Sequence, residues 1–248
     1  IVTGATLSSD RFQNPNSAYS FIQSQDCEIY IPYNPSFNSS SITVSAWINP
    51  GNKGIPGSGA AIVHRYGYGY SNPSGEVFRL MLSQSNPGYL ESEILNQSQL
   101  TLTNIPVIVP LNTWSMVSFS FDGTDLKTYF NGVLVATNSQ PGFQLNIDGN
   151  SGLSIGISDQ GNGLWYRYEG LIDDVGFWNR ALSDSEISDI YTENNNSIKV
   201  KARVILQSAW ASGYDMYQQL NTLDMVPQSQ PYNYAPWHYS GQEYVFSV

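Results

Sequence analysis

Two glutamates at alternate positions could carry out acid–base chemistry. Glu91 and Glu93 lie in the run YLESEI, and side chains two positions apart on a strand point to the same face of a sheet. A retaining glycosidase uses two carboxylates about 5 Å apart, one as the acid and one as the nucleophile. This pair is therefore the basis for an enzyme hypothesis. The opposing interpretation places both side chains on a solvent-facing edge, with Leu90 and Ile94 supplying the core.

The two histidines and the single cysteine form no catalytic or metal-binding pattern. His64 and His238 are far apart in the sequence, and neither has an HxxE or HxH spacing or a neighbouring nucleophile. Cys27 shares a strand face with Ile29 and Ile31 in DCEIYIP, which predicts a buried structural thiol. One cysteine excludes an intrachain disulfide and a cysteine-based zinc site, so oxygen ligands would have to hold any metal.

Aromatic residues in two glycine-rich segments could stack on sugar rings. A flat ring packs against the apolar face of a pyranose, while neighbouring polar groups bond to its hydroxyls. In RYGYGYSNPSG, the three residues Tyr66, Tyr68 and Tyr70 alternate with glycine and would share one side of an extended segment. In GNGLWYRYEG the candidates are Trp165, Tyr166 and Tyr168.

The charge balance excludes several classes of partner. The chain of 248 residues has 20 acidic and 10 basic side chains, which gives a net charge of −10. A surface of this sign repels nucleic-acid phosphates and anionic membranes, and it suits cations or neutral polar ligands. No apolar run reaches the length of about 18 residues that a membrane helix needs. We therefore expect neither nucleic-acid binding nor membrane insertion.

Short strand-like runs separated by Gly, Pro, Asn and Ser predict an all-β sandwich. The clearest hairpin, DLKTYFNGVLVAT, turns at Asn131-Gly132, a pair that accepts the positive φ angles of a type I′ turn. With the preceding run it predicts a three-stranded meander. Three tryptophans within or beside strands, Trp47, Trp114 and Trp178, are interpreted as packing residues. The predicted strands are Ala18–Phe21, Glu28–Ile31, Ile42–Ile48, Ala60–His64, Val77–Ser83, Tyr89–Leu95, Trp114–Phe121, Leu126–Phe130, Val133–Thr137, Leu153–Ile157 and Gly170–Trp178.

One short helix is predicted after the last strand, at SDSEISDIY. Ser183 and Glu186 have the three-residue spacing of a capping box. Ile187, Ile190 and Tyr191 recur at helical spacing and form an apolar stripe. This helix would therefore close the sandwich by packing one face against it.

The composition changes after the helix, and we place a domain boundary near Asn195. Residues 1–195 would form the sandwich, and residues 196–248 a small, incomplete β unit that contains IKVKARVILQ and PQSQPYNYAPWHYSG. The chain opens at Ile1 without the features of a signal peptide. We therefore expect a mature product or, as the preferred interpretation, a domain of a larger polypeptide.

Six sequence blocks occur in a characteristic order: DRFQNPNSAYSF, ITVSAWINP, AAIVHRY, NTWSMVSFSFDGTDLKTYFNGVLVA, LSIGIS and YEGLIDDVGFWNRALSDSEISDIY. In this order they resemble the bacterial laminin-G-like, concanavalin-A-like family. The resemblance implies an all-β jelly-roll sandwich of two antiparallel sheets in a secreted multidomain protein. The tail resembles a C-terminal module of large Bacteroidetes surface proteins exported by type IX secretion. This second resemblance implies an extracellular or cell-surface location.

The family resemblance favours non-catalytic recognition of a glycan or polysaccharide. Sandwich glycosidases have a third carboxylate close to such a pair, whereas Ser92 and Ile94 flank the glutamates here, so we expect no catalytic residues. One alternative is an adhesive or architectural spacer of a surface adhesin that contacts another surface protein, and a second is a polysaccharide-degrading enzyme of the same fold. The loop after the strand that carries Arg65 often borders the ligand face in such sandwiches. The expected ligand-binding residues are Arg65, Tyr66, Tyr68, Tyr70, Trp165 and Tyr166.

The family resemblance also implies a structural calcium ion where the N-terminal segment meets the late GLIDDV strand. Calcium takes six to eight oxygen ligands. Strict alternation would place Asp173 on the same face as Val175 and Phe177, which is costly for a carboxylate unless a cation compensates it. The alternative is that Arg11 or Arg180 pairs with these carboxylates. The expected calcium ligands are Asp10, Asn14, Asp173 and Asp174.

Overall fold

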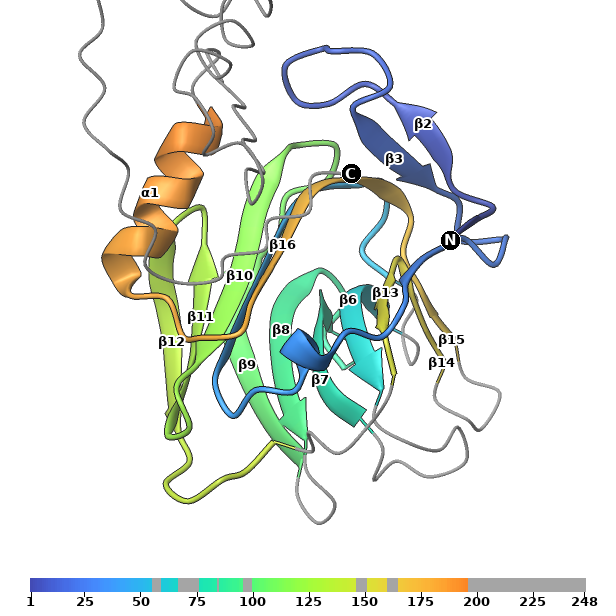
Figure 1. Ribbon diagram of the computed structural model, residues 1–248. Coiled ribbons are helices and arrows are strands. Elements are labelled where there is room, and N and C mark those ends of the chain that lie inside the picture. Colours follow the sequence, from blue (N-terminus) through green and yellow to red (C-terminus); the bar gives the residue numbers. More distant parts are fainter. Residues whose placement is uncertain are drawn as a thin grey trace, which may run out of the picture. The chain divides into compact units, whose positions relative to one another are not determined.

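A computed structural model describes residues 1–54, 59–66, 76–83, 85–95, 100–145, 151–159 and 165–195. These residues form two seven-stranded antiparallel sheets that face each other, with a separate two-stranded ribbon of β14 (Ile157–Asp159) and β15 (Trp165–Arg167) (Figure 1). The predicted all-β sandwich is confirmed. The tail from residue 196 onward lies outside the described residues, so the boundary near Asn195 and the C-terminal unit stay predictions.

Sheet A has the strand order β1-β4-β13-β6-β7-β8-β9. Its last strand was not predicted and contains Pro106. Proline lacks an N–H group for a ladder, and it is tolerated at an edge such as this one. The strands are β1 (Val2–Thr3), β4 (Glu28–Ile31), β6 (Ala60–Tyr66), β7 (Glu76–Leu82), β8 (Tyr89–Leu95), β9 (Leu100–Ile108) and β13 (Leu153–Ile155).

Sheet B has the strand order β12-β11-β10-β5-β16-β3-β2. The predicted meander is confirmed, because β10, β11 and β12 are neighbours. Its hairpin turns through Asn131 and Gly132, whose φ angles of 50° and 76° are the positive values that the pair was expected to supply. The strands are β2 (Thr6–Ser8), β3 (Ala18–Phe21), β5 (Ile42–Pro50), β10 (Ser115–Phe121), β11 (Asp125–Phe130), β12 (Val133–Ser139) and β16 (Gly170–Trp178).

Alternate residues of both sheets fill the space between them. From β10, for example, Val117, Phe119 and Phe121 enter this core and are completely buried. Burial of such a side chain contributes about 1.5–3 kcal/mol. Cys27 belongs to the same core and is 2% exposed, which confirms the predicted structural thiol.

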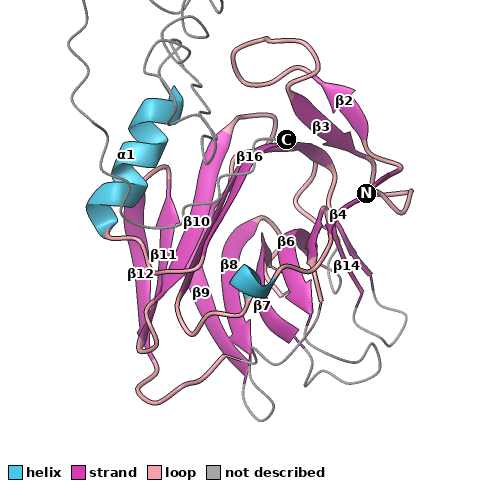
Figure 2. Ribbon diagram, viewed as in Figure 1, coloured by secondary structure: helices cyan, strands magenta, loops and turns pink. Residues whose placement is uncertain are grey.

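The helix α1 (Asp184–Asn195) covers the outer face of sheet B (Figure 2). The predicted capping box is confirmed: Ser183 Oγ accepts a bond from Glu186 N at 3.3 Å, and Glu186 Oε2 accepts one from Ser183 N at 2.8 Å. Ile187 packs against the sheet, and the ring of Tyr191 stacks on Trp47 at 5.5 Å between centroids. Within the described residues, no helix has the length and apolar content to cross a membrane.

The three tryptophans that were interpreted as packing residues lie together under this helix. Trp47 is 3% exposed, and Trp114 and Trp178 are half-buried against the same hydrophobic cluster. This confirms the prediction. It also places a large aromatic cluster on the outer face of sheet B, where it serves the attachment of α1.

Candidate functional site

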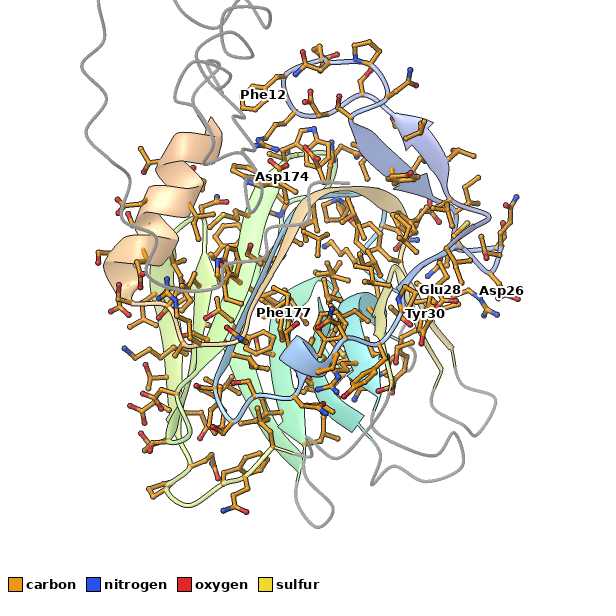
Figure 3. All side chains as sticks on the ribbon, in the orientation of Figure 1. Phe12, Asp26, Glu28, Tyr30, Asp174 and Phe177 are labelled. Carbon is orange, nitrogen blue, oxygen red and sulfur yellow. The ribbon has the colours of Figure 1, made fainter. Side chains whose placement is uncertain are left out.

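A row of polar side chains crosses the outer face of sheet A. The strand register pairs Glu93 with Arg79, Arg79 with His64, His64 with Ser154, and Ser154 with Tyr30. Residues paired in this way project from the same face of a sheet. The first three are at most 5% exposed, and the last two are half-buried. The polar row thus runs from a buried end on β8 to a more open end on β4, where Figure 3 labels Tyr30.

Arg79 is the central cation of this polar row. Its Nε donates to Glu93 Oε2 at 2.5 Å, and its terminal nitrogen contacts the same oxygen. The guanidinium also lies over the ring of Tyr166, 4.9 Å from the centroid. Tyr166 packs on Ala61 and Met81. The ribbon of β14 and β15 therefore covers part of the outer face and brings an aromatic ring to the ion pair.

Glu91 lies next to the polar row and has an unsatisfied carboxylate oxygen. It is opposite Met81 in the register and 6% exposed. Its Oε2 is buried and receives no hydrogen bond from the described residues. A polar oxygen that is buried without a hydrogen-bond donor is costly, so it favours the approach of a hydroxyl or another donor.

The glutamates do not occupy the solvent-facing edge that the sequence suggested. β8 lies between β7 and β9, and both side chains are buried on the outer face of sheet A. The prediction failed because it assumed that a sheet face with charged residues is exposed to solvent. Here the ribbon covers part of that face, and Arg79 pairs with Glu93. Sequence reasoning also missed Arg79. Its signal is a single basic residue in EVFRLML, where every other position after Glu76 is apolar.

Arg65 lies in the interior instead of at the ligand-facing surface that the prediction requires. It is 1% exposed, donates to Phe37 O at 2.6 Å and contacts Asn38 Oδ1. Burial lowers the pKa of this guanidinium to about 10. Arg65 therefore donates to oxygens at the end of the 3-10 helix η1 (Pro35–Phe37) and on the residue that follows it.

The predicted aromatic residues are only partly described. Tyr166 is 4% exposed beside Arg79, and Tyr168 is 1% exposed and donates to Leu171 O at 3.2 Å. Tyr66 ends β6 and Trp165 begins β15, but their side chains lie outside the described part. Tyr68 and Tyr70 also lie outside it. β14 and β15 lie beside β6, so the strands that carry Tyr66 and Trp165 are neighbours. The ligand contacts of these aromatic residues stay predictions.

The residues expected to bind calcium do come together, at a separate place on the outer face of sheet B. Arg11 NH1 contacts Asp173 Oδ2 and NH2 contacts Asp174 Oδ2, each at 2.8 Å. Burial raises the pKa of Asp173 to about 6, with Asp174 adding to the rise and Arg11 opposing it. Asp10 accepts bonds from Phe12 N and from Asn14. This group, Asp10, Arg11, Phe12, Asn14, Trp47, Asp173 and Asp174, is the Arg11 cluster.

The predicted face of Asp173 is wrong, because β16 contains a bulge. The register shifts between Asp173 and Gly176, and Asp174 has a φ of 43°. The extra residue lets Ile172 and Val175 both enter the core, while Asp173 opposite Trp47 faces outward. A bulge inserts one residue and changes the alternation of faces, which simple alternation could not foresee.

Residues 23–188 match the family described as the concanavalin A-like lectin/glucanases superfamily. No curated protein matches the sequence. The fold is similar to a heptameric pentraxin from Limulus polyphemus, with 19% identity and a TM-score of 0.53 over 71% of this chain and 81% of the other.

Two further solved structures are similar to this chain and contain bound sugar. A sialidase carbohydrate-binding module from Ruminococcus gnavus, bound to α2,3-sialyllactose, has 17% identity and a TM-score of 0.53 over 66% of this chain and 96% of its own. Domain 4 of an extracellular arabinanase from Geobacillus stearothermophilus, in complex with arabinotriose, has 19% identity and a TM-score of 0.53 over 75% and 87% of the two chains. At these identities the similarity shows the fold.

Proposed function

Because the chain belongs to the concanavalin A-like lectin/glucanases superfamily, we propose that it is a non-catalytic glycan-binding module of a secreted or cell-surface protein. The observation that carries this proposal is the polar row on sheet A with the unsatisfied carboxylate of Glu91 beside it. Glycan hydroxyls both donate and accept hydrogen bonds. On the outer face of sheet A, Arg79 supplies a cationic donor and Glu91 and Glu93 supply carboxylate acceptors. Tyr166 adds an aromatic ring beside Arg79.

The burial of ionisable groups in and beside the polar row lowers the stability of the fold, so packing alone does not account for these residues. Ionisable groups removed from solvent lower stability unless they are paired, and replacement of a buried pair by apolar residues is often neutral or stabilising. Within the described part of the chain, Glu91 Oε2 has no hydrogen-bond partner. A ligand donor would satisfy this oxygen. The sugar complexes of the two similar modules support a glycan as the class of ligand.

Hydrolysis is the second candidate, because Glu91 and Glu93 do share one face of β8. Their register partners Met81 and Arg79 belong to the same neighbouring strand. However, Arg79 holds Glu93 as an ion pair, so this carboxylate is poorly suited to donate a proton. The non-catalytic proposal accounts for both glutamates with one role, hydrogen bonding to a bound sugar.

The test is a glycan array probed with the full chain and four variants. We expect binding to at least one oligosaccharide, and about 10–100-fold weaker binding by Glu91→Gln, since a hydrogen bond to a charged group contributes about 1.5–3 kcal/mol. Tyr68→Ala and Trp165→Ala test the predicted aromatic residues. The matched control is Asp189→Asn, which removes an exposed carboxylate from α1.

Two results would reject the proposal. A folded chain that binds nothing on the array favours the adhesive spacer, whose partner would be another surface protein. Release of shorter sugars from a polysaccharide panel, abolished by Glu91→Gln or Glu93→Gln, favours the glycosidase.

A further inference from the structure

The family resemblance implies a calcium ion at the place where the Arg11 cluster lies. The two segments expected to hold the ion meet there: the loop between β2 and β3, and the bulge of β16. Figure 3 labels Phe12 on that loop and Asp174 on that strand. What joins the two segments is a side chain of the protein, because the guanidinium of Arg11 bonds to both Asp173 and Asp174.

Carboxylate oxygens of all three aspartates expected to bind calcium already accept bonds from donors of the protein. Asp10 Oδ1 accepts bonds from Phe12 N at 2.8 Å and Asn14 N at 2.9 Å, and its Oδ2 accepts one from Asn14 Nδ2 at 2.9 Å. Asp173 Oδ2 and Asp174 Oδ2 face the guanidinium nitrogens at 2.8 Å. Calcium needs six to eight oxygens that face the ion.

The described residues therefore do not fit a calcium site. No group of three or more Asp, Glu, His or Cys residues in the described part of the chain has a metal-binding arrangement. A cation of the protein occupies the space between the two carboxylates. Arg11 and a calcium ion cannot both hold the same oxygens.

The surroundings of Arg11 fix it in this position. Its side chain is 4% exposed, as is that of Asp173. The guanidinium lies over the ring of Trp47 at 4.4 Å and over the ring of Phe12 at 4.6 Å from the centroids. A planar guanidinium suits both contacts, since it stacks on aromatic faces and offers several donors in one plane.

We infer that Arg11 takes the structural place of the calcium ion, so that the loop between β2 and β3 is held to β16 without metal. The guanidinium bridges carboxylates from β16 and ties them to a loop whose own turn is organised by Asp10. A single arginine thus supplies the cross-link that the family resemblance assigns to an ion.

The test compares thermal melting of the full chain in EDTA and in added calcium chloride. We expect the same melting temperature for the wild-type chain in both solutions. Arg11→Ala should melt about 6–20 °C lower in EDTA, since it leaves buried carboxylates without their cation. Calcium should then raise its melting temperature, because the variant frees the carboxylate oxygens, and Asp173→Asn in the same chain should abolish that gain.

Arg167→Ala is the matched control, because Arg167 forms an ion pair with Asp26 whose partners are 31% and 69% exposed. It should change the melting temperature little in either solution. If Arg11→Ala does not fold, Arg11→Lys replaces it, since lysine keeps the charge but lacks the planar fork that reaches two carboxylates. The inference is rejected if calcium stabilises the wild-type chain, or if Arg11→Ala melts like the wild type in EDTA.

Discussion

At the scale of single residues, Arg79 and Glu93 offer the sharpest test of the polar row. Their side chains are 6% and 5% exposed. Arg79→Met should lower the free energy of unfolding by about 3–5 kcal/mol, because it leaves the carboxylate of Glu93 buried without its counter-charge. The double variant Arg79→Met/Glu93→Leu should recover most of that loss. Urea denaturation measures both changes.

The exposed pair of Arg167 and Asp26 provides the comparison for that experiment. Arg167→Met should cost no more than about 1 kcal/mol, because solvent screens this pair. A double variant that is as unstable as Arg79→Met would show that Arg79 stabilises the sheet through packing rather than through its charge.

Residue types drew attention to the carboxylates of the polar row and of the Arg11 cluster, but spacing did not reveal which cations pair with them. The family resemblance correctly predicted that the segment of Asp10 and the segment of Asp173 meet. It could not choose between an ion and Arg11, because both satisfy the same carboxylates. Nor could it place Arg65, whose partners Phe37 and Asn38 are 28 and 27 positions away. Contacts between residues so distant in sequence depend on the tertiary arrangement.

At the scale of elements, the hairpin of β11 and β12 is coupled to α1 through Gly132. A Cβ atom at this residue would lie 2.8 Å from Cβ of Tyr191, and its φ is +76°. Gly132→Ala should therefore cost backbone strain and a steric clash, together about 2–4 kcal/mol. Gly123→Ala is the control, because its φ is +97° with nothing within 4 Å.

Chemical denaturation of the two variants isolates the contact with Tyr191. The control should lose only the contribution of the backbone, about 1 kcal/mol. Equal losses in both variants would mean that Tyr191 moves aside at no cost and that α1 is not fixed by the hairpin.

The start of α1 gives a prediction for the pH dependence of stability. Bonds from Arg180 and from the Ser183 backbone lower the pKa of Glu186 from 4.5 to about 2. The folded chain then binds fewer protons there than the unfolded chain, so the carboxylate stabilises above pH 4.5 and this stability is lost as the pH falls toward 2. The melting temperature of wild type minus that of Glu186→Gln should be positive at pH 6 and vanish near pH 2.

This difference in melting temperature should be small, at most about 2–4 °C. The side chains of Arg180 and Glu186 are 42% and 41% exposed, so solvent screens their ion pair. Asp189→Asn on the same helix is the control. A difference that grows as the pH falls would show that the protonated carboxyl is the form preferred by the folded chain.

Elements with a local signature were predicted well. The boundaries of β3, β4, β8 and β16 agree with the predictions, and the Asn131-Gly132 turn and the capping box are both present. The short strands β1, β2 and β15, most of β14 and the edge strand β9 were missed. Two or three residues leave too little pattern to detect, and Pro106 in β9 argues against a strand unless the edge position is known.

At the scale of the whole molecule, we predict that residues 1–195 fold without the tail. Both sheets, the ribbon and α1 lie within these residues, and the hydrophobic clusters of the described part end at Tyr191. A chain ending at Asn195 should melt within a few degrees of the full chain. Circular dichroism over a temperature ramp measures this. A large drop in melting temperature would show that the predicted boundary cuts through a shared core.

The fold of the sandwich could be predicted from its sequence blocks, whereas the polar row on sheet A could not. The blocks lie on β3, β5, β6, β10 to β13 and β16, which build both sheets. The polar row instead depends on which residues of β4, β6, β7, β8 and β13 become neighbours across the sheet. That register is set by the bulges between Ala61 and Val63 and between Arg65 and Tyr66 as much as by the strands themselves.

The bulge of β16 makes one residue of this chain dispensable for the sheet. Between Trp47 and Ser45 on β5 there is one residue, whereas between their partners Asp173 and Gly176 on β16 there are two. Deletion of Asp174 would leave Ile172 and Val175 facing the core, with Asp173 between them facing outward. A chain one residue shorter here can therefore keep the same core, and it loses the contact of Arg11 with Asp174 and the bond from Asp174 N to Asp173 Oδ1.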